Sequence, residues 1–145
     1  MLKNILFGGA GFRSIPGNLG LALLRIFTGV AISFGHGIGK MPPSDGFISG
    51  TAKLGFPMPT IFAWAAGLSE FAGGILLALG LFTRVSSFFI AFTMFVAAFL
   101  RHVSDPFDTK EKALLYLFIA LLFVGMGSGQ LGVDAMIREN GGQKG

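Results

Sequence analysis

The sequence predicts an all-α fold, a four-transmembrane-helix up-and-down bundle, on three observations. The mean hydropathy of the 145 residues is +0.73 and 52% of them are hydrophobic, whereas only 12% are charged. Phe is abundant, with 17 copies. A soluble domain of this length cannot hide that much apolar surface, so lipid is the expected solvent. The third observation is a set of long apolar runs separated by short polar segments.

These runs have the length that a membrane span requires, since roughly 20 helical residues cross a ~30 Å hydrocarbon core. Helices are expected because lipid offers backbone amides no partner, and the runs lack the alternation typical of barrel strands. The expected spans are residues 19–39, 60–82, 85–103 and 111–127.

Residues that favour helix ends agree with these boundaries. Pro57 and Pro59 precede the second run, and the sequence Asp-Thr-Lys-Glu at 108–111 is typical of a capping box that opens the fourth. Only Thr83 and Arg84 separate the second and third runs, which predicts antiparallel neighbouring helices.

The longer connections, residues 40–59 and 104–110, are expected on one side of the membrane, where together they would form a lid over the bundle. The expected domain organisation is an interfacial N-terminal arm (1–18), a membrane domain (19–137) and a polar C-terminal tail (138–145). The apolar stretch of the arm is short and broken by glycine, which favours an interfacial segment over a secretory signal.

Charge and cysteine content exclude several classes of function. The net charge of +4 suits anionic lipid headgroups, but no basic stripe outside the spans supports nucleic-acid binding. Basic residues divide evenly between the two expected sides, so the positive-inside rule gives no orientation. The chain has no Cys, so a redox role requires a borrowed cofactor.

Polar residues inside the first expected span form one edge of that helix. Arg25 and His36 are eleven residues apart, close to three turns, with Gly29 and Ser33 between them on the same side. Lys40 continues this edge by one more turn. The edge is expected to face protein or water rather than lipid.

The second expected span carries a matching edge. Glu70 lies about ten residues into it, a costly depth for a carboxylate. Ala63, Gly67 and Gly74 share its face, which predicts a groove where another helix approaches closely. Antiparallel packing puts Glu70 between the depths of Arg25 and His36, so it is expected to pair with either one.

Two interpretations of these groups stay open. In one, Arg25 and Glu70 form a structural ion pair that fixes helix register. In the other, Arg25, His36, Lys40 and Glu70 line a ligand-binding pocket that opens toward the longer loops. His36 and His102 both fall near span ends, where an interfacial role is common, so no haem or metal is expected.

The glycine-rich segment 127–132 matches a dinucleotide fingerprint by letter, but it follows an apolar helix with no strand, so it is expected to terminate that helix. Five Phe of the third span are expected to face lipid or pack in the core: Phe88, Phe89, Phe92, Phe95 and Phe99.

Over residues 19–137 the chain resembles the DoxX family of small four-helix membrane proteins. The resemblance rests on the order and spacing of short segments, which lie at 24–29, 35–37, Lys40, 70–74, 79–84, 125–129 and Asp134. It implies a multi-pass protein of the prokaryotic plasma membrane with cytoplasmic termini. The family takes its name from a small subunit associated with thiosulfate:quinone oxidoreductase, and some relatives are linked to oxidative and thiol stress. Membership defines no catalytic residue set.

The expected function is that of a small membrane subunit, an accessory to a quinone-linked oxidoreductase, which binds quinone or another lipophilic ligand in a redox or oxidative-stress system. Arg25, His36 or Lys40 would donate to a quinone oxygen, while Glu70 or His36 would relay a proton. The alternative is a non-enzymatic scaffold that recruits a partner, and a third interpretation is a small-solute or proton pathway. Expected partners are membrane lipids, a redox protein and a second copy of the chain.

Overall fold

The computed structural model describes residues 6–140, and all of their regular structure is helical, which confirms the all-α prediction. Six α-helices lie wholly within these residues: α2 (Ile15–Ile32), α3 (Asp45–Lys53), α4 (Pro59–Leu79), α5 (Thr83–Val96), α6 (Phe107–Met126) and α7 (Val133–Asn140). Helices α2 and α5 continue beyond their α-helical residues into turns of other helical types. A π-helical turn at Ser33–Gly37 and a 3-10 turn at Ile38–Lys40 extend α2, and a second π-helical turn at Ala97–Arg101 extends α5.

Three helical stretches of the described chain are long and apolar enough to cross a membrane: Ile15–Lys40, Pro59–Leu79 and Thr83–Arg101. They correspond to the first three expected spans. The helix α6 has comparable length, but charged residues occupy its first two turns. The structure therefore gives three candidate spans, one fewer than expected.

Two predicted helix starts are displaced. Helix α2 begins at Ile15, because the Ser14 hydroxyl accepts from the Gly17 amide and Pro16 occupies the first turn. Part of the expected N-terminal arm is thus helical. The capping box predicted for the fourth helix is wrong, since α6 begins at Phe107 after Pro106 and no side chain caps it.

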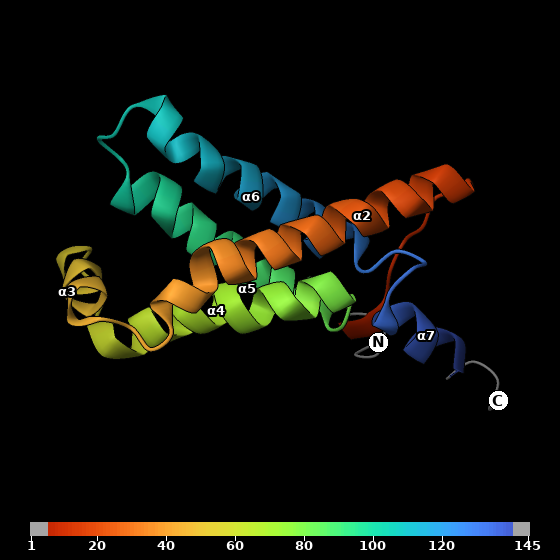
Figure 1. The fold of residues 1–145 in the computed structure, drawn as a ribbon, viewed down its shortest axis with the longest axis horizontal. Helices are drawn as coiled ribbons and strands as arrows, with labels where there is room; N and C mark the ends of the chain where they lie inside the picture. The colour runs from red at the N-terminus through yellow and green to blue at the C-terminus, as the bar shows by residue number, and fades with distance from the viewer. Residues whose placement is uncertain (1–5, 141–145) are drawn as a thin grey trace.

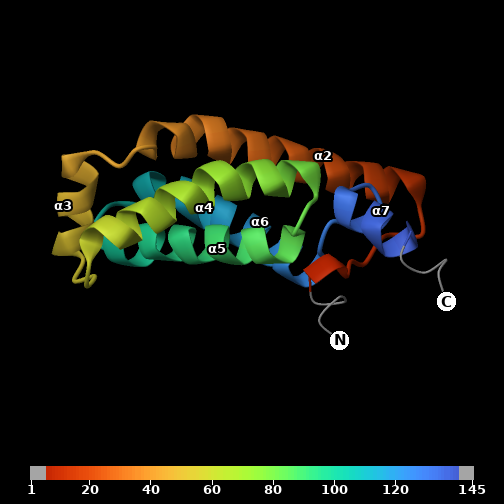
Figure 2. The ribbon, with the colours of Figure 1, turned by 90° about the horizontal axis from the view of Figure 1, so that it is seen from below.

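The four long helices lie side by side, as Figure 1 and Figure 2 show. Helix α4 packs against both α2 and α5, and α5 packs along α6, whereas α2 and α6 make little contact with each other. Helix α3 closes one end of the bundle against α4. Helix α7 lies at the opposite end, where α2 begins.

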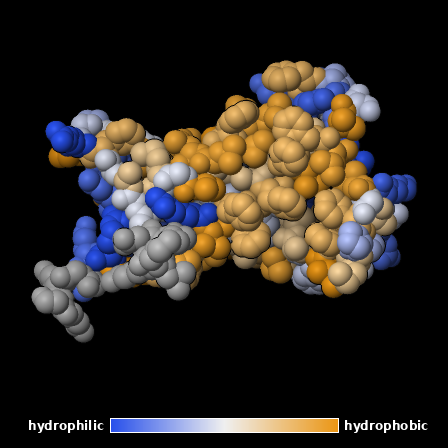
Figure 3. Space-filling view, turned by 180° about the vertical axis from the view of Figure 1, so that it is seen from behind, coloured by the Kyte–Doolittle hydropathy of each residue, from blue (hydrophilic) through white to orange (hydrophobic). Residues whose placement is uncertain are grey.

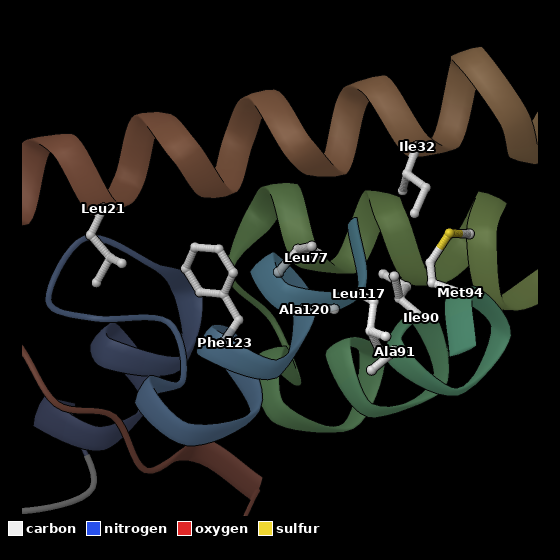
Figure 4. Packing of buried hydrophobic residues seen from close by; sticks show 9 residues of the cluster. All are labelled: Leu21, Ile32, Leu77, Ile90, Ala91, Met94, Leu117, Ala120 and Phe123. Atoms are coloured by element: carbon white, nitrogen blue, oxygen red, sulfur yellow. The ribbon is translucent and has the colours of Figure 1, made fainter. Parts of the chain in front are cut away.

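Buried apolar side chains from all four long helices form one core (Figure 4). The cluster comprises Leu21, Ile32, Leu77, Ile90, Ala91, Met94, Leu117, Ala120 and Phe123. Outside it, apolar residues cover the middle of the surface and hydrophilic residues gather toward the two ends, as Figure 3 shows for one face. The five Phe of α5 and its extension are about half exposed, consistent with a lipid-facing position.

Helices α2 and α4 cross at the predicted stripe of small residues. A Cβ on Gly29 would overlap the Gly74 carbonyl and lie 2.5 Å from the amide nitrogen of Ala78. Nearby, the Ser33 hydroxyl donates to the Phe71 carbonyl of α4 at 2.8 Å. The groove expected on the Glu70 face of the second span is thereby confirmed, and α2 with its π-helical extension fills it.

Candidate functional site

The intramembrane carboxylate of Glu70 pairs with Lys40. The Lys40 Nζ atom lies 2.6 Å from both Oε1 and Oε2, so it donates to each carboxylate oxygen. The Glu70 side chain is 1% exposed, while that of Lys40 is 32% exposed. The ion pair therefore joins a buried acid to a base that reaches the surface of the bundle.

The π-helical turn at Ser33–Gly37 explains why Lys40 is the partner. A π turn winds fewer degrees per residue than an α turn, so residues beyond it are rotated around the helix axis. Gly37 also lies against the backbone of Glu70 and Phe71, where a Cβ would not fit. The close approach and the changed winding bring Lys40 onto the face of α4. Of the predicted polar edge, Arg25, Ser33 and Lys40 contact α4, whereas His36 faces α6.

A cavity of about 510 Å³ lies next to this pair, between α3, α4 and the end of α5. Its walls are mostly apolar, with the ion pair on one side. Aromatic residues from three helices and from the connection between α3 and α4 contribute to the lining: Phe47, Phe56, Phe62, Phe89 and Phe92. The cavity combines hydrocarbon walls with a charged group, which is typical of sites for amphipathic small molecules.

The sequence did not lead us to expect helix α3, which forms part of this site. Ser44 caps it by accepting from the Phe47 amide, and Thr51 of the same helix is buried. The Phe47 ring centroid lies 5.5 Å from Lys40 Nζ, a cation–π distance. Lys40 thus contacts α3 and α4 together. The cap residue Ser44, followed by apolar residues at helical spacing, is the signal that predicts this helix.

Other polar side chains, for which the sequence predicted no role, also line this cavity. The Thr93 hydroxyl donates to the Phe89 carbonyl at 2.9 Å, and its oxygen lies 3.2 Å from the Ser69 hydroxyl oxygen, within hydrogen-bonding distance. His102 also lines the cavity, and its Nδ1 lies 2.6 Å from Oδ2 of exposed Asp105. Of the two longer connections, residues 40–59 contribute to this cavity through α3, whereas no residue of 104–110 lines it, so the lid predicted from both connections is not observed.

Arg25 lies elsewhere, and its predicted pairing with Glu70 is wrong. Its side chain is buried, and Nη1 donates at 3.0 Å to the carbonyls of Leu77 and Ala78 at the end of α4, while Nη2 donates to the Leu131 carbonyl. Fifteen residues separate Arg25 from Lys40, about 22 Å along a helix. Arg25 therefore binds the C-terminal end of α4, where carbonyls lack intrahelical partners.

Asp134 of α7 completes that end of the bundle. Its carboxylate accepts from the backbone amides of Phe82 and Thr83 and from the Thr83 hydroxyl, at 2.8 to 2.9 Å. These are the first amides of α5, so Asp134 caps that helix from a distant part of the chain. Gly127 ends α6 with a φ of 69°, which confirms that segment 127–132 terminates a helix.

His36 also lies apart from the ion pair. Its ring packs edge-on against the Tyr116 ring of α6, with centroids 5.6 Å apart. It lines a second cavity between α2 and α6 rather than the one that contains Glu70. Of the four predicted ligand residues, the structure brings Lys40 and Glu70 together, and it places His36 and Arg25 in two other surroundings. Within residues 6–140, no three His, Asp or Glu side chains cluster as metal ligands would.

The geometry of the first cavity suits a lipophilic molecule with a polar head. Its Phe-rich walls accept hydrocarbon, Lys40 supplies N–H donors, and Glu70 supplies carboxylate acceptors.

Comparison with known proteins gives a match to the DoxX family over residues 20–103. An uncharacterized protein of Haemophilus influenzae is 36% identical over 124 residues, which cover 79% of this chain and 87% of that protein. A Bacillus subtilis protein named "Putative oxidoreductase CatD" is 30% identical over 120 residues, covering 82% of this chain and 87% of its own length. The Escherichia coli "Inner membrane protein YphA" is 36% identical over 86 residues, 59% of this chain and 61% of that protein. No solved structure matches the chain.

Proposed function

The chain belongs to the DoxX family of membrane proteins, and from this premise we propose that it is a small membrane subunit that binds a quinone in the cavity beside Lys40 and Glu70. The observation that supports this proposal is the buried ion pair at the wall of an otherwise apolar cavity. The name of the Bacillus subtilis relative, which includes the word oxidoreductase, supports a role in redox chemistry.

The residues of the cavity fit such a ligand. Phe62, Phe89 and Phe92 offer the hydrocarbon and aromatic contacts that a prenylated ring prefers. The Lys40 ammonium is a donor for a ring carbonyl oxygen, and the hydroxyls of Ser69 and Thr93 lie on the same cavity. A bound quinone supplies two-electron, two-proton redox chemistry.

Within this proposal each residue has a defined task. Lys40 orients the polar ring by donation, Glu70 holds a proton next to it, and the aromatic walls exclude water from both. The chain has no cysteine, so the electrons come from a redox protein partner, and the chain acts as an accessory subunit of a quinone-linked oxidoreductase.

The topology that suits this role has four spans. Helix α6 contains 20 residues, about 30 Å at 1.5 Å per residue. Its charged residues all lie in the first two turns, where they would reach the headgroups, and its remainder is apolar. With α6 as the fourth span, both termini lie on one side, the cytoplasmic side of a prokaryotic plasma membrane. The name of the Escherichia coli relative supports the inner membrane as the location.

The test is lipid extraction of the full-length protein after gentle solubilisation, with quinones quantified by mass spectrometry. We expect prenylated quinone to co-purify with the wild type, and Glu70→Gln and Lys40→Met to lose most of it. Glu111→Gln is the matched control, because Glu111 is exposed and lines neither cavity. A Glu70→Gln protein that retains its quinone, or that changes only in stability and in capture of a partner protein, contradicts the proposal and favours the scaffold alternative.

A further inference from the structure

Helices α2 and α6 are the two walls of a second cavity, which is separate from the one proposed for quinone. They make little contact with each other, although each packs well on its other neighbour. The cavity between them has a volume of about 640 Å³, and none of its lining residues is shared with the first. Because the bundle is not closed along this seam, the cavity is a groove on its lateral surface.

One part of this groove is apolar and the other is polar. Six apolar residues make its long walls: Leu24, Phe27, Val30, Phe34, Leu115 and Ile119. His36, Tyr116 and Lys112 lie together toward the α3 end of the bundle, where α6 begins and the α2 stretch ends. The side chains that could bind a headgroup are therefore gathered at one end of a hydrocarbon slot.

The position of Lys112 fixes the depth of that polar end. Lys112 is exposed and lies in the second turn of α6, where the helix carries its charged residues. It is the formally cationic residue among those that line the groove, and no carboxylate lines it. Asp108 in the first turn of α6 accepts from the Thr109 amide, so the positive charge at the lining of this end comes from Lys112. The polar end therefore favours an anion at the level of the lipid headgroups.

The length of the groove matches a single acyl chain. Its lining on α2 extends from His36 back to Leu24, twelve residues or about 18 Å along the helix. This distance reaches from the headgroup region to about the middle of a ~30 Å hydrocarbon core. A lipid tail that follows the groove would replace the contacts that α2 and α6 do not make with each other.

We propose that this groove is a binding site for an anionic phospholipid of the leaflet on the α3 side. Lys112 pairs with the phosphodiester, the His36 ring and the Tyr116 hydroxyl donate to headgroup oxygens, and one acyl chain lies between α2 and α6 along Phe27 and Leu115. Charge complementarity and the one-tail length select this occupant over a second copy of the chain. The site also gives His36 a role that the quinone cavity does not.

The experiment is native mass spectrometry of full-length protein in detergent, titrated with phosphatidylglycerol or phosphatidylcholine of identical acyl chains. We expect the wild type to bind phosphatidylglycerol more tightly. Lys112→Gln should weaken phosphatidylglycerol binding about fivefold, the effect of one basic residue at a membrane surface, and weaken phosphatidylcholine binding less, because the choline ammonium offsets the charge of its phosphodiester. Lys53→Gln removes an exposed charge at the same end of the bundle outside the groove, so it should change neither.

A second variant tests the acyl slot without touching the charge. Ala31 lines the groove, and Ala31→Trp should fill it and reduce the binding of both lipids. Equal affinity of the wild type for the two lipids, or equal effects of Lys112→Gln and Lys53→Gln, would overturn the proposal. Displacement of phosphatidylglycerol by a short-chain quinone would also overturn it, since the groove would then be the quinone site. Loss of quinone from Glu70→Gln with unchanged lipid binding separates this inference from the proposed function.

Discussion

Lys40 donates to both carboxylate oxygens of Glu70 at 2.6 Å, and this pair links the end of the first long helical stretch to the middle of α4. The acid is almost fully buried and the base is about one-third exposed. Removal of the base therefore leaves a carboxylate with neither a counter-ion nor water. Replacement of both Lys40 and Glu70 by Met would leave an apolar contact in place of the ion pair.

This relationship predicts a non-additive effect on stability. We expect Lys40→Met to lower the free energy of unfolding by about 3 kcal/mol, since a buried acid is left unpaired. The double variant Lys40→Met/Glu70→Met should recover most of that loss. The measurement is unfolding by SDS in mixed micelles, followed by far-UV circular dichroism. Additive losses in the double variant would show that the two side chains do not interact.

The close crossing of α2 and α4 predicts opposite effects for two glycines of one helix. A Cβ at Gly29 would overlap the backbone of α4, so Gly29→Ala should push the helices apart and destabilise the bundle by about 2 kcal/mol. Nothing lies within 4 Å of a Cβ at Gly20, so Gly20→Ala is the matched control. It should be neutral or raise stability by up to about 1 kcal/mol through helix propensity. The same unfolding assay compares them, and equal shifts would contradict the observed crossing.

Arg25 at the end of α4 predicts a strict requirement for a guanidinium. Two nitrogens of its fork reach three carbonyls, whereas the ammonium of Lys has a different geometry. Arg25→Lys should therefore destabilise the fold by about 2 kcal/mol, the scale of a lost hydrogen bond to a charged group.

The matched control for Arg25 is Arg13→Lys, an exposed position before α2, which should change stability by less than about 0.5 kcal/mol. Because Arg25 lies far from the first cavity, Arg25→Lys should keep its quinone in the fraction of protein that remains folded. A selective loss of quinone from stable Arg25→Lys protein would assign this residue to the ligand site instead.

The fold was predictable where hydropathy and helix signals determine it. Long apolar runs identified the three stretches that meet the length and composition of a membrane span, and the small residues around Glu70 predicted the close helix crossing. Glu70 itself was identified from the cost of burying its charge in lipid. These features depend on local composition, which the sequence displays directly.

The partners of the charged residues were not predictable in the same way. Ideal α-helical winding puts His36 on the edge that faces α4, but His36 lies in the π-helical turn at Ser33–Gly37, and its ring packs against Tyr116 of α6. Arg25 binds backbone carbonyls, which no side-chain pattern reveals. The N-cap that Asp134 supplies to α5 joins segments far apart in the chain, so only the tertiary structure shows it.

The four-span topology predicts that Ser14 and Asn140 lie on one side of the membrane and Asp45 on the other. The chain contains no cysteine, so Ser14→Cys, Asn140→Cys and Asp45→Cys each introduce a single labelling site. All three positions are exposed and lie at the ends of helices. In intact cells, a membrane-impermeant maleimide should label Asp45→Cys alone, because cytoplasmic thiols become accessible only after lysis. Labelling of both Ser14→Cys and Asp45→Cys would contradict a membrane crossing by the first helical stretch. Opposite labelling of Ser14→Cys and Asn140→Cys would instead show an odd number of spans and exclude α6 as the fourth.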